Sequence, residues 1–240
     1  MIGLLYPTRD CGEDDFTLLA GRLDSSPAVD FAYVPWGQQP ATIERASLRA
    51  AVRELGEPGR LVAAAAAFDP KPRVVSWACS SCSFLDGPAG ARAQAEALRT
   101  ALGIPASSTS LAFVAAARHL GLSRIALASV YQPDITEAFV DFLAAEGIET
   151  VSDVSRDAAS DRDLATWGPG PITDLVREAD SPDAAAVLVP ETALHTAPLL
   201  ADLERRTGKP VLTATQVTVW HALTLLGQPA TGAGLGTLLA

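Results

Sequence analysis

The sequence predicts an α/β protein made of two pseudo-symmetric Rossmann-like halves, each a parallel sheet covered by helices, with the active site in the cleft between them. Short apolar segments alternate with longer amphipathic segments along the chain, which is typical of parallel strands joined by helical crossovers. Residue types of the first half also recur in the second half at a constant spacing. We therefore expect two similar sheets that face each other.

The expected strands are short apolar runs, and the expected helices are longer segments with one apolar face. The strands are Ile2–Tyr6, Val29–Val34, Arg73–Trp77, Arg124–Ala128, Thr150–Val154, Ala186–Val189 and Pro210–Thr213. The helices are Ala41–Leu55, Ala89–Leu102, Leu111–Leu120, Ile135–Glu146, Pro171–Ala179, Leu199–Arg206 and Val217–Leu226. The stretch from Ser155 to Ala165 is rich in Asp, Arg and Ser, so we expect a polar loop there.

The internal repeat is clearest where a helix ends and a strand and the next helix follow. Its first copy contains Gly103, Pro105, Ser108, Ser110 and Ala117, and 105 positions later its second copy contains Gly208, Pro210, Thr213, Thr215 and Ala222. We predict that residues 1–103 together with 216–240 form the first half, which carries Cys79. Residues 104–215 then form the second half, which carries Tyr131 and Glu191.

Composition limits the classes of protein to be considered. Hydrophobic residues make up 48% of the 240 residues, as in ordinary globular proteins, and the net charge of -10 disfavours nucleic acids and anionic membrane surfaces as partners. The opening Met1–Tyr6 does not resemble a signal peptide, and the apolar run Leu61–Phe68 is too short to span a bilayer. An odd number of cysteines does not make a disulfide framework, so we expect a cytoplasmic protein. The oligomeric state, including a homo-oligomer, is left open.

Cys79 is the sharpest candidate for chemistry. It follows an apolar strand and precedes Ser80 and Ser81, at a turn where the next helix begins. The free N–H groups of that helix favour a thiolate, and together with the two hydroxyls they suit a carboxylate ligand. A buried structural cysteine is the simpler alternative. The pair Cys79 and Cys82 also has the spacing of a thiol–disulfide exchange site, although Cys82 is more consistent with a core residue.

Glu191 occupies the position in the second half that Cys79 occupies in the first, directly after an apolar strand. Partial burial would raise the pKa of its carboxyl towards the range that is useful for proton transfer. Tyr131 also follows a strand, so that its hydroxyl could donate to a substrate oxygen or its ring could cover the sheet edge. His195 lies four residues after Glu191 and could approach the cleft. No dinucleotide fingerprint, P-loop, metal-ligand cluster or lysine Schiff-base signature is present.

Four segments together resemble a known family, namely Ile2–Pro7, Ala78–Phe84, Ala126–Tyr131 and Gly208–Trp220. They are similar to the maleate isomerase and arylmalonate decarboxylase branch of the aspartate/glutamate racemase superfamily, in the same order over nearly the whole chain. The resemblance implies two similar α/β domains and no cofactor. It also implies one catalytic residue from each half, acting on opposite faces of a small carboxylic acid.

By this resemblance, Cys79 stands where the isomerases and racemases have their first cysteine, and Ser80, Ser81 and Tyr131 match positions that bind the substrate carboxylate. The main departure is Glu191, which stands where the family is expected to carry its second cysteine. Asp10 likewise replaces an asparagine that is typical of maleate isomerases.

The leading hypothesis is a cofactor-independent isomerase of a small carboxylic acid, which catalyses either cis–trans isomerisation, as in the maleate isomerases, or racemisation. Cys79 and Glu191 are its predicted catalytic residues, and the predicted substrate-binding residues are Ser80, Ser81, Tyr131, Thr192, Thr8 and Asp10. The first alternative is decarboxylation of a malonate-type acid, and the second is a carboxylate-binding protein without catalysis. Product analysis distinguishes the three hypotheses.

Overall fold

The strands form two parallel four-stranded sheets in the computed structural model, which describes residues 1–36 and 45–240. The first sheet has the order β2-β1-β3-β4, with β1 at Ile2–Tyr6, β2 at Val29–Tyr33, β3 at Val74–Trp77 and β4 at Ala106–Ser108. The second sheet has the order β6-β5-β7-β8, with β5 at Arg124–Ser129, β6 at Glu149–Ser155, β7 at Ala186–Val189 and β8 at Val211–Thr213. Because the two orders correspond strand by strand, the predicted pair of equivalent sheets is confirmed.

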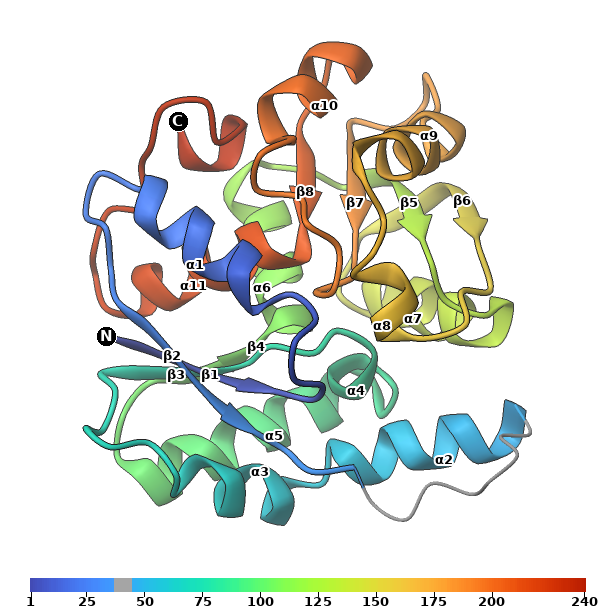
Figure 1. The fold of residues 1–240 in the computed structure, drawn as a ribbon. Helices are drawn as coiled ribbons and strands as arrows, with labels where there is room; N and C mark the ends of the chain where they lie inside the picture. Colours follow the sequence, from blue (N-terminus) through green and yellow to red (C-terminus); the bar gives the residue numbers. More distant parts are fainter. Residues whose placement is uncertain (37–44) are drawn as a thin grey trace.

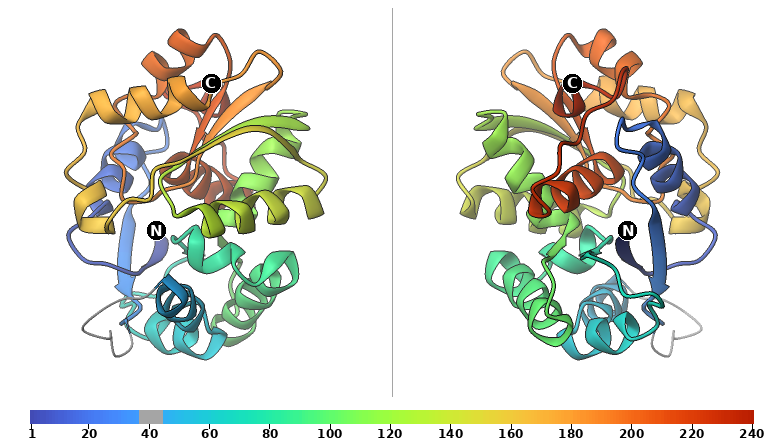
Figure 2. Two further views of the ribbon diagram at one scale, coloured as in Figure 1. Left: turned by 90° about the vertical axis from the view of Figure 1, so that its right-hand side faces the viewer. Right: turned by 90° about the vertical axis from the view of Figure 1, so that its left-hand side faces the viewer.

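Helices follow the strands and cover the sheets. They are α1 (Glu13–Arg22), α2 (Arg45–Leu55), α3 (Pro58–Ala65), α4 (Ser81–Phe84), α5 (Gly87–Leu102), α6 (Thr109–His119), α7 (Pro133–Ala145), α8 (Asp161–Leu164), α9 (Pro169–Ala179), α10 (Leu200–Thr207) and α11 (Ala214–Leu225), with a 3-10 turn at Thr237–Leu239. Figures 1 and 2 show α2, α3 and α5 together at one end of the molecule and α9 and α10 at the other. The two sheets lie between these groups of helices.

The burial of the strands explains why their sequences read as they do. Every residue of β1, β3 and β7 is buried, which requires the continuous apolar runs that identify these strands in the sequence. The edge strands β2 and β6 are mostly half-buried, and β6 accordingly carries polar residues along its length. Burial therefore distinguishes β1, β3 and β7 from the outer strands β2 and β6, whereas the outer strands β4 and β8 are mostly buried.

The residues of the internal repeat end one helix and begin the next. Gly103 and Gly208 end α5 and α10 in the left-handed conformation, with φ of 65° and 69°, which glycine adopts without a steric penalty. Ser108 and Thr213 are then the N-caps of α6 and α11; the side chain of Ser108 accepts a hydrogen bond from the backbone N–H of Leu111. The repeat is thus a pair of equivalent helix–strand–helix connections.

Several short elements lie outside the predicted ones. β4 has the sequence Ala-Ser-Ser and so lacks an apolar run, whereas α4 and α8 each contain four residues and have no helical periodicity to detect. α8 lies within the expected polar loop at 155–165. The helix expected at Ala41–Leu55 is described from Arg45, and residues 41–44 lie outside the described part of the chain.

The helices α6 and α11 join the two halves. They pack against each other, and the hydroxyls of Thr109 and Thr218 form a buried hydrogen bond of 2.8 Å between them. α11 also packs on β3, β4 and α1, which supports placing the segment after residue 216 with the first half. β4 pairs with β3 in the first sheet, although it follows the predicted boundary at 103. The exact division of the chain stays a prediction. None of the helices described is long and apolar enough to cross a membrane.

Candidate active site

A cavity of about 450 Å³ opens where the carboxyl ends of the two sheets meet. Its walls come from the loops after β1, β2 and β3 of the first sheet and after β5, β6 and β7 of the second. Ligands of open parallel sheets bind at this end of the strands, because successive loops converge there. Seven of the eight predicted site residues line this cavity, namely Thr8, Cys79, Ser80, Ser81, Tyr131, Glu191 and Thr192.

Cys79 lies two residues beyond the end of β3 and is 6% exposed. Its Sγ lies 3.8 Å from Oγ of Ser81, the first residue of α4. The Oγ atom of Ser80 is buried at the cavity wall and has no hydrogen-bond partner within the part of the chain described. A buried hydroxyl without a partner is costly, so Ser80 is well suited to bind a polar ligand atom.

Burial affects the acidity of the other two cysteines, Cys11 and Cys82. Burial, with the negative charge of Asp161, raises the pKa of the Cys11 thiol to about 11. Burial and the adjacent Cys79 raise the pKa of the Cys82 thiol well above its ordinary value. All three cysteines are free. Cys11 and Cys82 are therefore held as thiols at neutral pH.

Glu191 lies two residues beyond the end of β7, the counterpart of β3. Its side chain is buried, and its Oε1 accepts a hydrogen bond of 2.7 Å from the backbone N–H of Ala193. Burial and the negative charge of Asp161 raise the pKa of Glu191 to about 8, against the lowering effect of the Ala193 N–H. Glu191 is therefore mostly a carboxylic acid at neutral pH and can donate a proton.

Tyr131 follows β5 and braces the loop that carries Glu191. Its hydroxyl donates a short hydrogen bond to the carbonyl of Pro190, the residue before Glu191. The edge of its ring packs on Phe84 of α4, with ring centroids 5.9 Å apart. Burial raises the pKa of the phenol well above its ordinary value, so Tyr131 acts as a hydrogen-bond donor and not as a base.

Asp161 is a site residue that the sequence reasoning missed. It begins α8 and lines the cavity, where its Oδ2 accepts a hydrogen bond of 2.8 Å from the Thr8 hydroxyl. Thr8 Oγ1 accepts in turn a hydrogen bond of 3.2 Å from Nε1 of Trp36, which was also missed. Ser160 is the N-cap of α8, because its Oγ accepts a hydrogen bond from the backbone N–H of Asp163. The sequence Ser-Asp-Arg-Asp is therefore the signal from which the start of this helix could have been predicted.

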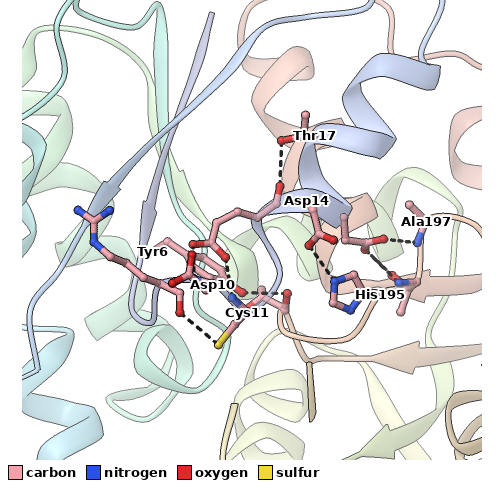
Figure 3. Close-up of polar contacts among 12 residues, drawn as sticks. Tyr6, Asp10, Cys11, Asp14, Thr17, His195 and Ala197 are labelled. Carbon is pink, nitrogen blue, oxygen red and sulfur yellow. Dashed lines mark hydrogen bonds and ion pairs between the residues drawn. The ribbon is translucent and has the colours of Figure 1, made fainter. Parts of the chain in front are cut away.

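Asp10 is the predicted site residue that the structure does not bring to the cavity. It is exposed, with a left-handed φ of 59°, and its backbone N–H donates to the Glu13 carboxylate at 2.9 Å. His195 likewise does not line the cavity, because its Nε2 lies 2.8 Å from the Asp14 carboxylate on α1 (Figure 3).

A buried clamp holds the Glu191 loop against the first half. The Asp15 carboxylate of α1 is 1% exposed and accepts hydrogen bonds of 3.0 and 2.9 Å from the backbone N–H groups of Thr196 and Ala197. The Tyr6 hydroxyl donates to the carbonyl of Thr192 at 3.1 Å (Figure 3). Gly12 permits this approach, because a Cβ there would lie 2.1 Å from the Thr192 carbonyl oxygen. α1 thus fixes the backbone on which Glu191 sits.

This fold and site define an α/β enzyme of the aspartate/glutamate racemase type, with a cysteine and an acid at the ends of equivalent strands. The family model described as arylmalonate decarboxylase matches residues 42–239. The chain belongs to the arylmalonate decarboxylase family. Within the described residues, no group of three or more His, Cys, Asp and Glu side chains could hold a metal ion.

Individual relatives agree with this assignment. The arylmalonate decarboxylase of Bordetella bronchiseptica is 32% identical over 156 residues, which are 64% of this chain and 65% of the relative. A maleate isomerase of Geobacillus stearothermophilus is 25% identical over 179 residues, covering 72% and 71% of the two chains. A solved double mutant of arylmalonate decarboxylase in its liganded form has a TM-score of 0.83 at 26% identity, covering 99% of this chain and 97% of that chain.

Proposed function

We propose that this protein is a cofactor-independent isomerase or racemase of a small carboxylic acid, with Cys79 and Glu191 acting on opposite faces of the substrate. The observation that carries the proposal is their placement. Both lie two residues beyond corresponding strands of equivalent sheets, and both line one cavity.

The proposed reaction removes one proton from the substrate and adds another proton on the opposite face. The thiolate of Cys79 removes the proton from the carbon beside the carboxylate and becomes a thiol, while the electron pair spreads into the carboxylate as an enediolate. Glu191, in its acid form, delivers its proton to the opposite face of the carbon and becomes a carboxylate. Transfer in the reverse direction, or exchange with solvent, restores the two groups.

The hydroxyls of Ser80, Ser81 and Thr192 are placed to hold the substrate carboxylate. All three residues line the cavity beside the proposed catalytic pair. Hydrogen bonds that strengthen as charge develops on the enediolate oxygens stabilise the transition state, and this contribution is usually the largest in such sites. Tyr131 supports the pair by fixing the Pro190 carbonyl.

Decarboxylation of a malonate-type acid is the second candidate function. The observation that favours it is the acid form of Glu191, since loss of carbon dioxide leaves an enediolate that needs a proton donor. The Bordetella bronchiseptica relative is named an arylmalonate decarboxylase. In that reaction Glu191 protonates the carbon, and Cys79 does not need to remove a proton first.

A screen of small mono- and dicarboxylic acids in deuterated water tests the proposal. Racemisation places deuterium on the carbon beside the carboxylate even when no net product accumulates, and cis–trans isomerisation gives an isomer without release of carbon dioxide. Decarboxylation releases carbon dioxide with incorporation of one deuterium. Binding of acids without either signal would contradict both reactions.

We also propose the cytoplasm as the compartment. Its support is that Cys11, Cys79 and Cys82 are all unpaired, as in reducing compartments.

A further inference from the structure

The cavity contains a second carboxylate that the proposed reaction does not use. Asp161 lines the cavity and accepts a hydrogen bond from Thr8 at 2.8 Å, and its charge is close enough to Glu191 to raise the pKa of that residue. Asp161 therefore bears on which acids the cavity accepts.

Two hydrogen-bond donors beside Asp161, those of Thr8 and Trp36, are already in use. The Thr8 hydroxyl has one proton and donates it to Asp161, and the indole N–H of Trp36 is donated to Thr8 Oγ1. On the opposite wall, the Tyr131 hydroxyl donates to the Pro190 carbonyl. A second substrate carboxylate beside Asp161 and Thr8 would find these donors already committed and would lose its hydrogen bonds from water.

The charges in this part of the cavity also disfavour a second anion. Arg162 is the one cationic side chain among the described lining residues; it is exposed, and its charge is offset by the adjacent Asp161. The other ionisable side chains of the lining, which are Cys79, Cys82, Tyr131, Asp161 and Glu191, are either neutral or negatively charged. A second substrate carboxylate would therefore add to the repulsion without an unpaired cation to balance it.

The remaining walls are apolar. Val52, Val130, Ile135 and Leu164 are all buried and line the cavity. Apolar side chains stabilise an apolar substituent by removing it from water. They provide no hydrogen bonds to a carboxylate, which would lose its bound water on entering this part of the cavity.

We propose that Asp161 makes the cavity selective for monocarboxylic acids with an apolar substituent and against dicarboxylic acids. The inference rests on the proposed function in taking this cavity as the carboxylate-binding site. One substrate carboxylate lies at Ser80, Ser81 and Thr192, and the substituent extends towards Asp161 and the apolar walls. Asp161 is a specificity-determining residue in this scheme and transfers no proton.

The test compares two acids that differ by one group. In 2-phenylpropanoate a methyl group stands where phenylmalonate has its second carboxylate. Calorimetric titration should show that the parent protein binds 2-phenylpropanoate at least about tenfold more tightly, as expected for one unfavourable charge contact. Asp161→Asn keeps an acceptor for Thr8 but removes the charge, so it should lower this ratio about tenfold by tightening the binding of phenylmalonate.

Two variants serve as controls. Asp163→Asn makes the same change on the same short helix, at an exposed side chain that does not line the cavity, and should leave the ratio within about twofold. Thr8→Val removes the hydrogen bond and keeps the Asp161 charge, so the preference for the monoacid should persist. This second variant keeps the test decisive if Asp161→Asn does not fold, which its melting curve would show.

The inference is overturned if the parent protein binds phenylmalonate as tightly as 2-phenylpropanoate, binds neither acid, or keeps its ratio in Asp161→Asn. Deuterium exchange is measured separately on the same proteins. Loss of the exchange signal with the ratio intact would contradict the proposed reaction and leave the selectivity standing.

Discussion

The Cys79 thiol and the Glu191 carboxyl occupy equivalent positions, each two residues beyond the third strand of its chain half, and face one cavity. The two groups nevertheless differ in chemistry. Because the pKa of Glu191 is raised to about 8, Glu191 holds a proton at neutral pH and can donate it. Cys79, in contrast, acts as a base only after its thiol has lost its own proton. The pair is therefore suited to accept a proton on one side and donate one on the other.

Cys79 should be alkylated faster than Cys11 and Cys82 by brief iodoacetamide treatment at neutral pH. The reacting species is the thiolate, and burial raises the pKa of the other two thiols. Peptide mapping of the labelled protein measures the three rates, with Cys79→Ala as the control. Faster labelling of Cys82, or a Cys79–Cys82 disulfide that forms and breaks with a redox partner, would favour thiol–disulfide exchange instead.

Removal of either member of the pair should nearly abolish turnover. Cys79→Ala and Glu191→Gln should each lower kcat about a hundred- to ten-thousand-fold, which is typical for loss of an acid or base. Glu137→Gln is a matched control, because Glu137 is exposed and does not line the cavity. Activity of Glu191→Gln within a few-fold of the parent would rule out Glu191 as the second acid or base.

Glu191→Cys restores the pair of cysteines that the family resemblance implies. If the protein is an isomerase or racemase, this variant should retain or redirect proton exchange, because a thiol at the same strand end can also carry the proton. Deuterium incorporation into the substrate measures the effect. An inactive but folded Glu191→Cys would show that the cavity is shaped around the carboxyl group.

The pH dependence of stability should show the raised pKa of Glu191 directly. A carboxyl whose pKa rises from 4.5 in the unfolded chain to about 8 in the folded protein binds more protons when folded over that interval. Its contribution to the free energy of unfolding is complete below about pH 4.5 and is lost as the pH rises through about 8. Urea unfolding of Glu191→Gln, compared with the parent at about pH 5 and about pH 8, should lack this loss.

Asp15 should affect both stability and turnover, although it does not line the cavity. Asp15→Ala leaves the buried N–H groups of Thr196 and Ala197 without their acceptor, at a cost of about 1–3 kcal/mol for each unsatisfied group. Release of the Glu191 loop should also lower kcat. Asp14→Asn is the control, because Asp14 is exposed and pairs with His195 outside the cavity. Unchanged kcat in a destabilised Asp15→Ala would confine Asp15 to a structural role.

The sequence contains enough information to predict the sheets but not all of the cavity. The apolar runs of β1, β3 and β7 exist because both faces of each strand are buried, and the positions of Cys79 and Glu191 follow from the ends of those strands. β4 was missed because the sequence Ala-Ser-Ser is held in place by pairing with β3 and not by its own hydrophobicity.

The remaining differences come from loops, whose positions depend on distant parts of the chain. Asp161 enters the cavity because the segment after β6 folds back to Thr8, a contact across 153 positions. Asp10 lies in the loop after β1 and is exposed, and its backbone N–H donates a hydrogen bond to Glu13. The sequence patterns near these residues do not specify the direction of either turn.

The pairing of a thiol with a carboxyl at the two strand ends has a kinetic consequence if the protein interconverts mirror-image substrates. The equilibrium between enantiomers is one to one, so the Haldane relation requires kcat/KM to be equal for the two hands. The thiol and the carboxyl can still hold their protons with different affinity, and each enantiomer requires a different one of them to be protonated at the start. The kcat values for the two enantiomers can then differ, provided that their KM values differ by the same factor. Two identical cysteines would not impose this asymmetry.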